Sequence, residues 1–254
     1  MNTENAHTNM PIALVTGANK GLGLATAKLL GSGGASVIIG SRDESLGAAA
    51  AAELRRAGFE AAHVQLDVTS DDSVAAAAEE IARRHGVLDI LVNNAGILPE
   101  ATTPNDDGAL RVDIFTTTFD TNVFGVVRVI DAMLPLLRKS AAGRIVNVSS
   151  TMGSLTDQSD PASPYYGLVV PAYQTSKAAL NGLTIALAKS LADTTITVNS
   201  VCPGWVQTDL GGPDNRAAAP LTADDAAGII ARTALCNDGA VTGRFVDRAG
   251  SVAW

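Results

Sequence analysis

The chain has 254 residues and a formal net charge of −8 at pH 7, and 46% of its residues are hydrophobic. A chain of this length can bury a large core, so it needs neither disulfides nor a structural metal to fold as one domain. Its 18 basic and 26 acidic residues form no long run of either sign, which argues against a nucleic-acid or anionic-membrane surface.

The two cysteines, Cys202 and Cys236, stand far apart and form no Cys-x-x-Cys pair. We therefore expect free thiols in a reducing cytoplasm rather than a disulfide framework or a zinc site. Residues 1–10 are polar and lack the basic and apolar segments of a leader, and no window of about 18 consecutive apolar residues occurs. The sequence predicts a frayed N-terminus at residues 1–10 and a cytoplasmic protein.

Short β-branched runs then alternate with Ala-rich segments of helical length, a pattern typical of βαβ units around a parallel sheet. The expected strands are residues 12–16, 36–41, 63–67, 89–93, 144–149, 196–201 and 243–247. Gly58 is expected to stop one intervening helix, and another is expected to start at a Ser/Asp cap and end at Gly86. Since no linker or repeat interrupts the alternation, the sequence predicts an α/β fold: a single domain over residues 11–254, a doubly wound Rossmann fold with a seven-stranded parallel sheet.

Two stretches, residues 98–108 and 151–172, are rich in turn-forming residues. Each follows an expected strand. In a parallel sheet both loops therefore lie at the carboxyl edge, where ligands bind.

A glycine-rich loop, "VTGANKGLG", follows the first expected strand and opens a helix. Gly17, Gly21 and Gly23 allow the backbone to turn tightly and approach a pyrophosphate, whose charge is favoured at the helix N-terminus. A plain strand-to-helix turn is the alternative. The position of the loop at the start of a βαβ series favours a dinucleotide site.

The second strand ends in "IIGSRD", where an acidic residue would select NAD by binding the ribose 2′-hydroxyl. Here Arg42 stands near that position, and Lys20 in the glycine loop adds a second cation for a 2′-phosphate. Both could also be ordinary solvated charges, and Asp43 leaves NAD open. We expect NADP.

All the tyrosines of the chain lie in one stretch, and one of them is a candidate proton donor. Tyr165 and Tyr166 are each followed four positions later by a valine, but Tyr173 is followed by Lys177. On a helix these positions share a face, and a nearby ammonium lowers the pKa of a phenol. The spacing indicates Tyr173, although such a pair is often only a helix surface.

Several motifs along the chain resemble those of the short-chain dehydrogenase/reductase family, whose nucleotide signature is Thr-Gly-x-x-x-Gly-x-Gly. The motifs are "TGANKGLG" at 16–23, "LDV" at 66–68, "NNAG" at 93–96, "TNVFG" at 121–125, "NVSS" at 147–150, "YQTSK" at 173–177 and "CPGWVQTD" at 202–209. Within the family the chain looks most like the NADPH-dependent carbonyl reductases.

The resemblance implies a catalytic set. It makes Tyr173 the general acid/base and Lys177 its partner, which also binds the nicotinamide ribose. Ser150 would orient the substrate carbonyl, with Ser149 on the opposite strand face as the neighbour that does not serve. Asn122 would hold a water molecule in a proton relay.

The resemblance, together with the glycine-loop and Arg42 arguments, also implies a set of cofactor contacts. These are Gly17, Asn19, Lys20, Gly21, Leu22, Gly23, Arg42, Asp67, Val68, Asn94, Ala95, Gly96, Tyr173, Lys177, Pro203, Gly204, Val206 and Thr208. Asn93 would help to hold the sheet.

The chain departs from the family pattern in the loop between Ser150 and Tyr173, which is longer than usual. Tyr165 and Tyr166 in this loop would either wall a substrate pocket or anchor the loop. The expected pocket residues are Leu98, Leu155, Tyr165, Tyr166 and Trp205. The longer loop leaves monomer and homo-oligomer open.

The expected function is hydride transfer between NADPH and a ketone or aldehyde, as in a carbonyl reductase or alcohol dehydrogenase. The alternatives are a 3-oxoacyl-thioester reductase and a catalytically silent NADP-binding sensor. The Tyr173/Lys177 pair disfavours the sensor, and the absence of a Gly-x-Ser-x-Gly motif disfavours a serine hydrolase.

Overall fold

The computed structural model describes residues 10–103, 110–236 and 241–254. Its sheet has seven strands in the order β3-β2-β1-β4-β5-β6-β7, and every neighbouring pair is parallel. The strands are β1 (Ile12–Thr16), β2 (Ser36–Ser41), β3 (Ala61–Gln65), β4 (Ile90–Asn93), β5 (Arg144–Val148), β6 (Thr197–Val201) and β7 (Phe245–Val246). The strand order reverses between β1 and β4, as in a doubly wound fold, so the predicted fold class is confirmed.

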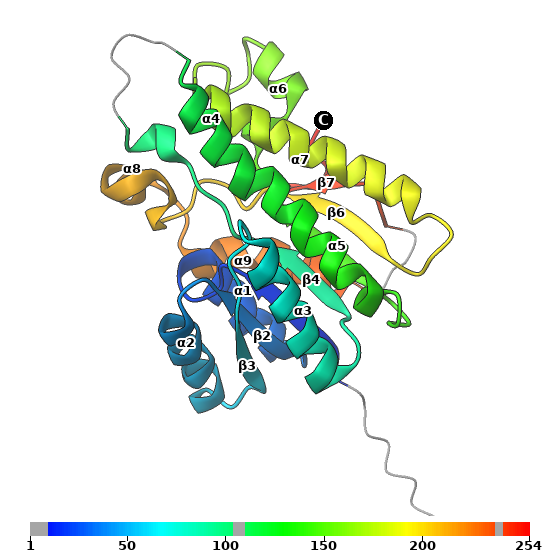
Figure 1. Cartoon of the computed structure of the whole chain (residues 1–254). Coiled ribbons are helices and arrows are strands. Elements are labelled where there is room, and N and C mark those ends of the chain that lie inside the picture. Colours follow the sequence, from blue (N-terminus) through cyan, green and yellow to red (C-terminus); the bar gives the residue numbers. More distant parts are fainter. Residues whose placement is uncertain (1–9, 104–109, 237–240) are drawn as a thin grey trace, which may run out of the picture.

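Helices cover both faces of this sheet (Figure 1). The helices are α1 (Gly21–Ser32), α2 (Glu44–Arg56), α3 (Asp71–His85), α4 (Val112–Phe119), α5 (Gly125–Leu137), α6 (Leu155–Ser159), α7 (Pro171–Ser190), α8 (Gly212–Ala218) and α9 (Ala223–Leu235). Short turns lie at η1 (Pro99–Ala101), η3 (Thr151–Gly153) and η4 (Asp209–Gly211), and a π-helical turn, η2 (Asp120–Phe124), joins α4 to α5.

Two hydrophobic cores hold the layers together, one on each face of the sheet. Leu14 of β1 packs in the core formed with α3, α5 and α7, whereas its neighbours Ala13 and Val15 pack in the core formed with α1, α2 and α9. This alternation follows from the period of two along a strand. Burying one Leu or Val side chain fully stabilises the fold by roughly 1.5–3 kcal/mol. The two cores therefore hold in place the sheet edge on which the site is built.

The helix ends follow the predicted signals. Gly58, which has φ +91°, lies two residues after the end of α2 at Arg56. Gly86, which has φ 71°, is the C-cap of α3. The Ser70 hydroxyl caps α3 by accepting from the N–H of Ser73. Left-handed backbone of this kind favours glycine, so the sequence marked these ends correctly.

β4, β5 and β6 are each one residue shorter than predicted, and two other strands differ more. β3 pairs with β2 from Ala61 to Gln65, two residues earlier than expected, so Asp67 lies beyond the strand instead of ending it. β7 contains only Phe245 and Val246, because Gly243 has a left-handed φ of 66° and cannot continue an extended strand into the ladder.

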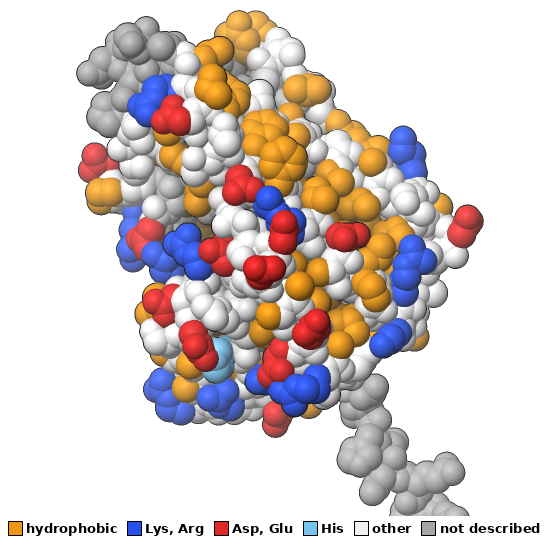
Figure 2. All heavy atoms as spheres, in the orientation of Figure 1, with side chains coloured by type: hydrophobic (Ala, Val, Ile, Leu, Met, Phe, Trp, Pro, Cys, Tyr) orange, Lys and Arg blue, Asp and Glu red, His pale blue; other side chains and the backbone are white. Residues whose placement is uncertain are grey.

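Some predictions fall on parts of the chain outside the described residues. Residues 1–9 of the expected frayed N-terminus lie outside the described residues, and so do residues 104–108 of the turn-rich loop at 98–108. Among the described residues, no helix is long and apolar enough to cross a membrane. Figure 2 shows acidic and basic side chains interspersed over the face that carries α3 and α5.

Candidate active site

The candidate site lies at the carboxyl ends of the central strands. The glycine loop follows β1, residues 94–103 follow β4, Ser150 follows β5, and residues 202–211 follow β6. These strands neighbour one another across the point where the strand order reverses. This is the position at which open α/β sheets bind their ligands.

The glycine loop has a backbone that other residues would disturb. Gly17 and Gly21 have positive φ values of 63° and 54°. A Cβ at Gly23 would lie 2.5 Å from the Gly17 carbonyl oxygen and 2.6 Å from Asn94 Nδ2. The loop therefore packs tightly against β4 and leaves its backbone exposed to a ligand.

The N-terminus of α1 is open to an anion. Its N-cap residue, Lys20, makes no capping hydrogen bond, and its first turn contains no acidic residue. By contrast, α2 is capped by Asp43 and α3 by Ser70. The unpaired N–H groups and the positive end of the α1 dipole thus fit the diphosphate of a dinucleotide.

Thr16 and Asn94 lock this loop to the end of β4. The Thr16 hydroxyl accepts from the N–H of Asn94 at 3.0 Å and of Ala95 at 2.9 Å, and Asn94 Nδ2 donates to the Thr16 carbonyl at 2.9 Å. The side-chain amide of Asn94 thus holds the loop, and the predicted contact of Asn94 with a cofactor stays a prediction. The role of Thr16 was missed, although its place directly before Gly17 was a usable signal.

Arg42 is exposed directly after β2, beside cavities of about 500 and 620 Å³. The neighbouring Asp43 carboxylate accepts from the Ser45 hydroxyl at 2.6 Å and from the Leu46 N–H at 3.0 Å. These bonds, that with Ser45 first, lower the pKa of Asp43. Because Asp43 is engaged as a helix cap, Arg42 is the exposed side chain directly after β2 whose charge is not used in capping α2.

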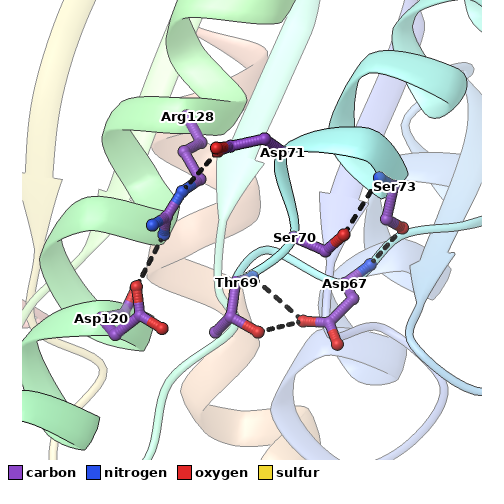
Figure 3. Close-up of polar contacts among 7 residues, drawn as sticks. All are labelled: Asp67, Thr69, Ser70, Asp71, Ser73, Asp120 and Arg128. Atoms are coloured by element: carbon purple, nitrogen blue, oxygen red, sulfur yellow. Dashed lines mark hydrogen bonds and ion pairs between the residues drawn. The ribbon is translucent and has the colours of Figure 1, made fainter.

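Asp67 and a nearby three-residue ion-pair group are shown in Figure 3. Burial acts to raise the pKa of Asp67, but hydrogen bonds from the Thr69 N–H and hydroxyl, and the charge of Arg42, outweigh it and lower the pKa. In the same view, Arg128 pairs with Asp71 at 2.7 Å and with Asp120 at 2.8 Å. This pairing ties α3 to the π-helical turn.

Lys20 is engaged by an acid from the other side of the site. Its Nζ lies 2.7 Å from Asp209 Oδ2, and Arg216 lies 2.8 Å from the other carboxylate oxygen. The predicted second cation for a 2′-phosphate is therefore shared with Asp209, a partner the sequence did not reveal.

Ser150 and Tyr173 meet at the centre of the site. Tyr173 is buried, and its phenol lies close enough to the Ser150 hydroxyl for this group to lower the pKa of the phenol. The Ser149 hydroxyl, in contrast, is buried without a hydrogen-bond partner. The structure thus brings together Ser150 and Tyr173, as the sequence predicted.

Lys177 is buried one helical turn from Tyr173, with its Nζ 5.5 Å from the centroid of the tyrosine ring. Its ammonium donates to the Val148 carbonyl at 2.8 Å. Burial lowers the pKa of Lys177 to about 8. Burial also raises the pKa of Tyr173, and Cys202 adds to the rise, while the Ser150 hydroxyl opposes it. Desolvation thus outweighs the lowering influences on the phenol, and the effect of Lys177 on the phenol pKa stays a prediction.

Asn122 lies in the π-helical turn η2 rather than in a regular helix. Its Oδ1 accepts from the Ile97 N–H at 2.9 Å, and its Nδ2 donates to the Ile97 carbonyl at 3.0 Å and to the Ser176 hydroxyl at 3.1 Å. The side chain thus joins the loop after β4 to α7, and a π-helical turn of this kind is frequent at functional sites.

A second polar chain ties α7 to the sheet. Asn93 Nδ2 donates to Asn147 Oδ1 at 2.9 Å, and Asn147 Nδ2 donates to the Thr184 hydroxyl at 2.9 Å. The predicted structural role of Asn93 is confirmed, and the bonds run from β4 through β5 to α7.

The predicted substrate-pocket residues differ in exposure. Leu98 and Tyr165 are half-buried, whereas Leu155, Tyr166 and Trp205 are 67, 50 and 52% exposed. Polar contacts that the sequence did not reveal hold the surrounding loop, since Gln174 accepts from the Val170 N–H at 3.1 Å and donates to the Leu168 carbonyl at 2.8 Å. Gln174 also donates to the side chain of Gln158.

The remaining predicted contacts belong to the segment after β6. Gly204 has a positive φ of 89°, Val206 pairs with Leu221 in an isolated parallel bridge, and the Thr208 hydroxyl caps η4. A Cβ at Gly21 would lie 3.5 Å from Thr208 Cγ2, so this segment lies directly over the glycine loop. Among the described residues, no cluster of His, Cys, Asp or Glu has the makings of a metal site.

Comparisons with known proteins agree with this arrangement. Residues 11–219 match the family described as "short chain dehydrogenase". A short-chain dehydrogenase/reductase of Saponaria officinalis is 36% identical over 288 aligned positions, which cover 93% of each chain. A 3-oxoacyl-acyl-carrier-protein reductase of Pseudomonas aeruginosa is 38% identical over 200 positions, covering 78% of this chain and 75% of that one.

A solved structure is also similar. The NADPH-bound carbonyl reductase from chicken fatty liver superposes with a TM-score of 0.81 and 29% identity, over 96% of this chain and 99% of that one. The order of the strands, the glycine loop and the sequence match lead to one conclusion: this chain belongs to the short-chain dehydrogenase family of oxidoreductases.

Proposed function

We propose that this protein transfers a hydride between NADPH and a ketone or aldehyde, with Tyr173 as the general acid/base. One observation carries the proposal: the buried phenol of Tyr173 lies beside the Ser150 hydroxyl and the buried Lys177. A buried tyrosine with a strongly shifted pKa and a charged neighbour, in a ligand-binding edge, is typical of catalysis. We propose residues 11–254 as one catalytic domain.

The cofactor proposal rests on the nucleotide side of the site. The uncapped N-terminus of α1 fits the diphosphate of the cofactor. Arg42 fits a 2′-phosphate, because the neighbouring Asp43 carboxylate is engaged in capping α2. The carbonyl reductase of chicken fatty liver, a relative in fold and sequence, is NADPH-bound. The predicted contacts from the glycine loop to Thr208 remain our proposed cofactor site.

The chemistry follows from the charge that develops on the substrate. Bound NADPH would supply the hydride to the carbonyl carbon. Tyr173 would donate its phenolic proton to the carbonyl oxygen, and the Ser150 hydroxyl would hydrogen-bond to the same oxygen as its charge develops. This donation leaves Tyr173 as a phenolate, which the nearby Lys177 ammonium would stabilise until a proton returns. Asn122, which fixes Ile97 and Ser176, would hold the relay in place.

The pKa of Tyr173 gives the proposal a direction. A phenol has an ordinary pKa of about 10, so Tyr173 is protonated at neutral pH and can act as an acid for reduction. Burial raises this pKa and so extends the protonated range to higher pH. Oxidation of an alcohol needs the phenolate. We therefore expect reduction to be favoured at neutral pH and the rate of oxidation to rise with pH.

The test is NADPH oxidation, followed by absorbance, against a panel of hydrophobic ketones and aldehydes and one 3-oxoacyl thioester. Tyr173→Phe should lower kcat by about 10²–10⁴-fold while NADPH still binds. Tyr166→Phe, the same substitution at a half-exposed tyrosine of the expected pocket wall, should leave kcat near that of wild type and change only the KM for the ketone. Turnover of the thioester alone would favour the acyl-thioester reductase, and NADPH binding without any turnover would favour the sensor.

The cellular setting is part of the proposal. Cys202 and Cys236 are free thiols, which fits a reducing compartment, and we propose the cytoplasm. The interspersed charges in Figure 2 fit a protein that acts on small molecules rather than on nucleic acid.

A further inference from the structure

Helix α7, which carries Tyr173, begins without a capping side chain of its own. Its N-cap residue, Val170, makes no side-chain capping bond. The N-cap residues of α2, α3 and α9 each accept from an N–H three residues later, and they are Asp43, Ser70 and Thr222. The first N–H groups of a helix have no partner within it, so those of α7 need one from elsewhere.

Glu100 supplies that partner from a distant part of the chain. Its Oε1 accepts from the N–H of Ala172 at 3.0 Å, and its Oε2 accepts from the N–H of Tyr173 at 2.8 Å. Both carboxylate oxygens thus bind consecutive backbone groups, one of them belonging to the proposed catalytic residue. A carboxylate at a helix N-terminus also interacts favourably with the helix dipole.

The segment that carries Glu100 is itself fixed. Two hydrogen bonds to Asn122, at 2.9 and 3.0 Å, hold both backbone groups of Ile97. The same Asn122 donates to the Ser176 hydroxyl of α7 at 3.1 Å. The loop after β4 therefore holds α7 directly, through Glu100, and indirectly, through the bonds of Asn122 to Ile97 and Ser176.

A local cap would satisfy the helix end, as it does in α2, α3 and α9. A cap from the loop after β4 does more, because it sets the place of α7 relative to the strand ends that bind the ligand. A shift of about 1 Å in a catalytic group can cost on the order of 10²-fold in rate. A shift of this size in the first turn of α7 would move Tyr173 away from Ser150.

We propose that Glu100 is a positioning residue for the reaction, which fixes the first turn of α7 and so holds the Tyr173 phenol against Ser150. The inference rests on the proposed function of Tyr173. Glu100 acts through the backbone of α7, since both its oxygens are engaged there.

The test compares kinetics and binding in Glu100→Ala and Glu100→Gln. Loss of both acceptors in the alanine variant should lower kcat about tenfold or more, and the glutamine variant, which keeps one acceptor oxygen, should lose less. The KM for the ketone and the Kd for NADPH should each change less than about twofold, because both oxygens of Glu100 are engaged on the backbone of α7. Glu79→Gln, the same charge change on an exposed residue of α3, is the matched control and should match wild type.

Hydrogen exchange gives a readout that does not depend on activity. The N–H groups of Ala172 and Tyr173 should exchange faster in Glu100→Ala than in wild type, while the rest of α7 stays protected. If the alanine variant does not fold, the glutamine variant carries the test through kcat and exchange.

The outcomes separate the two proposals. If wild type shows no turnover, or Tyr173→Phe is as active as wild type, the proposed function fails. If wild type is active and Tyr173→Phe is not, an unchanged kcat in Glu100→Ala overturns the positioning role. A parallel loss of kcat, substrate binding and NADPH binding overturns it as well, because that pattern indicates general damage.

Discussion

The Nζ of Lys177 lies 5.5 Å from the centroid of the Tyr173 ring, and both side chains are buried. Burial lowers the pKa of Lys177 from 10.5 to about 8. Between pH values equal to these two pKa values, the unfolded chain binds more protons at Lys177 than the folded chain does. The free energy of unfolding should therefore rise as the pH rises from about 8 to 10, by at most roughly 3 kcal/mol.

This rise is measured by denaturant unfolding of wild type and Lys177→Met at several pH values from about 7 to 10. Methionine has a similar length and no charge, so the difference in unfolding free energy should move in favour of wild type as pH rises. Lys189→Met, at an exposed position on α7, should show no such trend. A difference for Lys177→Met that is independent of pH would contradict the prediction.

The second prediction concerns the choice between NADPH and NADH. Arg42→Ala should weaken NADPH binding about 10- to 100-fold, the worth of charge-assisted bonds to a phosphate, and leave NADH binding unchanged. Asp209→Asn should tighten NADPH binding by up to about fivefold, because it frees Lys20 from a 2.7 Å ion pair between exposed groups.

Fluorescence titration of both cofactors measures these constants. The effect of Asp209→Asn should vanish when Lys20→Ala is also present, since the carboxylate acts through that ammonium. An equal gain in the presence and absence of Lys20, or a gain for NADH as well, would show that Asp209 acts by another route.

The sequence predicted the fold because its signals are local. Alternating apolar runs and Ala-rich segments gave the order of the elements, and the cap at Ser70 and the glycines at 58 and 86 marked helix ends. The start of β3 was misplaced because the pairing with β2, from Val37 to Ser41, decides the strand, and pairing is a tertiary property.

The site was predicted as far as its residues lie in motifs. Ser150 and Tyr173 meet as expected. The contacts of Glu100 with α7 and of Lys20 with Asp209 join residues 72 and 189 positions apart, in segments without periodicity. The raised pKa of Tyr173 depends on its degree of burial, which a spacing of four residues does not report.

The third prediction contrasts two glycines near α7. A Cβ at Gly153 would lie 2.6 Å from the Lys177 carbonyl carbon and 2.8 Å from the Ala178 N, whereas a Cβ at Gly182 would meet nothing within 4 Å. Gly153→Ala should therefore lower the free energy of unfolding by about 1–3 kcal/mol and reduce kcat, since η3 carries Ser150 at its start.

Gly182→Ala is the matched control within the helix. It should raise the free energy of unfolding by about 0.5–1 kcal/mol, because alanine loses less conformational freedom in a helix, and should leave kcat unchanged. Urea unfolding and steady-state kinetics on the two variants measure both effects. Equal stability of the two variants would be incompatible with the close approach of η3 to α7.

The fourth prediction concerns Trp254, which ties the loop before α7 to the end of the sheet. Its carbonyl oxygen accepts from the Thr156 N–H at 3.0 Å and from the Thr156 hydroxyl at 2.8 Å, and its ring stacks on Phe245 with centroids 5.5 Å apart. Thr156→Val removes one bond and should raise the KM for the ketone about two- to fivefold, the worth of a single neutral hydrogen bond, while Thr156→Ser keeps the hydroxyl and should match wild type. Trp254→Ala should act in the same direction because it removes the stacking that holds the carbonyl in place.

In all three variants the Kd for NADPH should stay unchanged, since α6 lies away from the glycine loop (Figure 1). A change in NADPH affinity as large as the change in KM would refute a role confined to the substrate side.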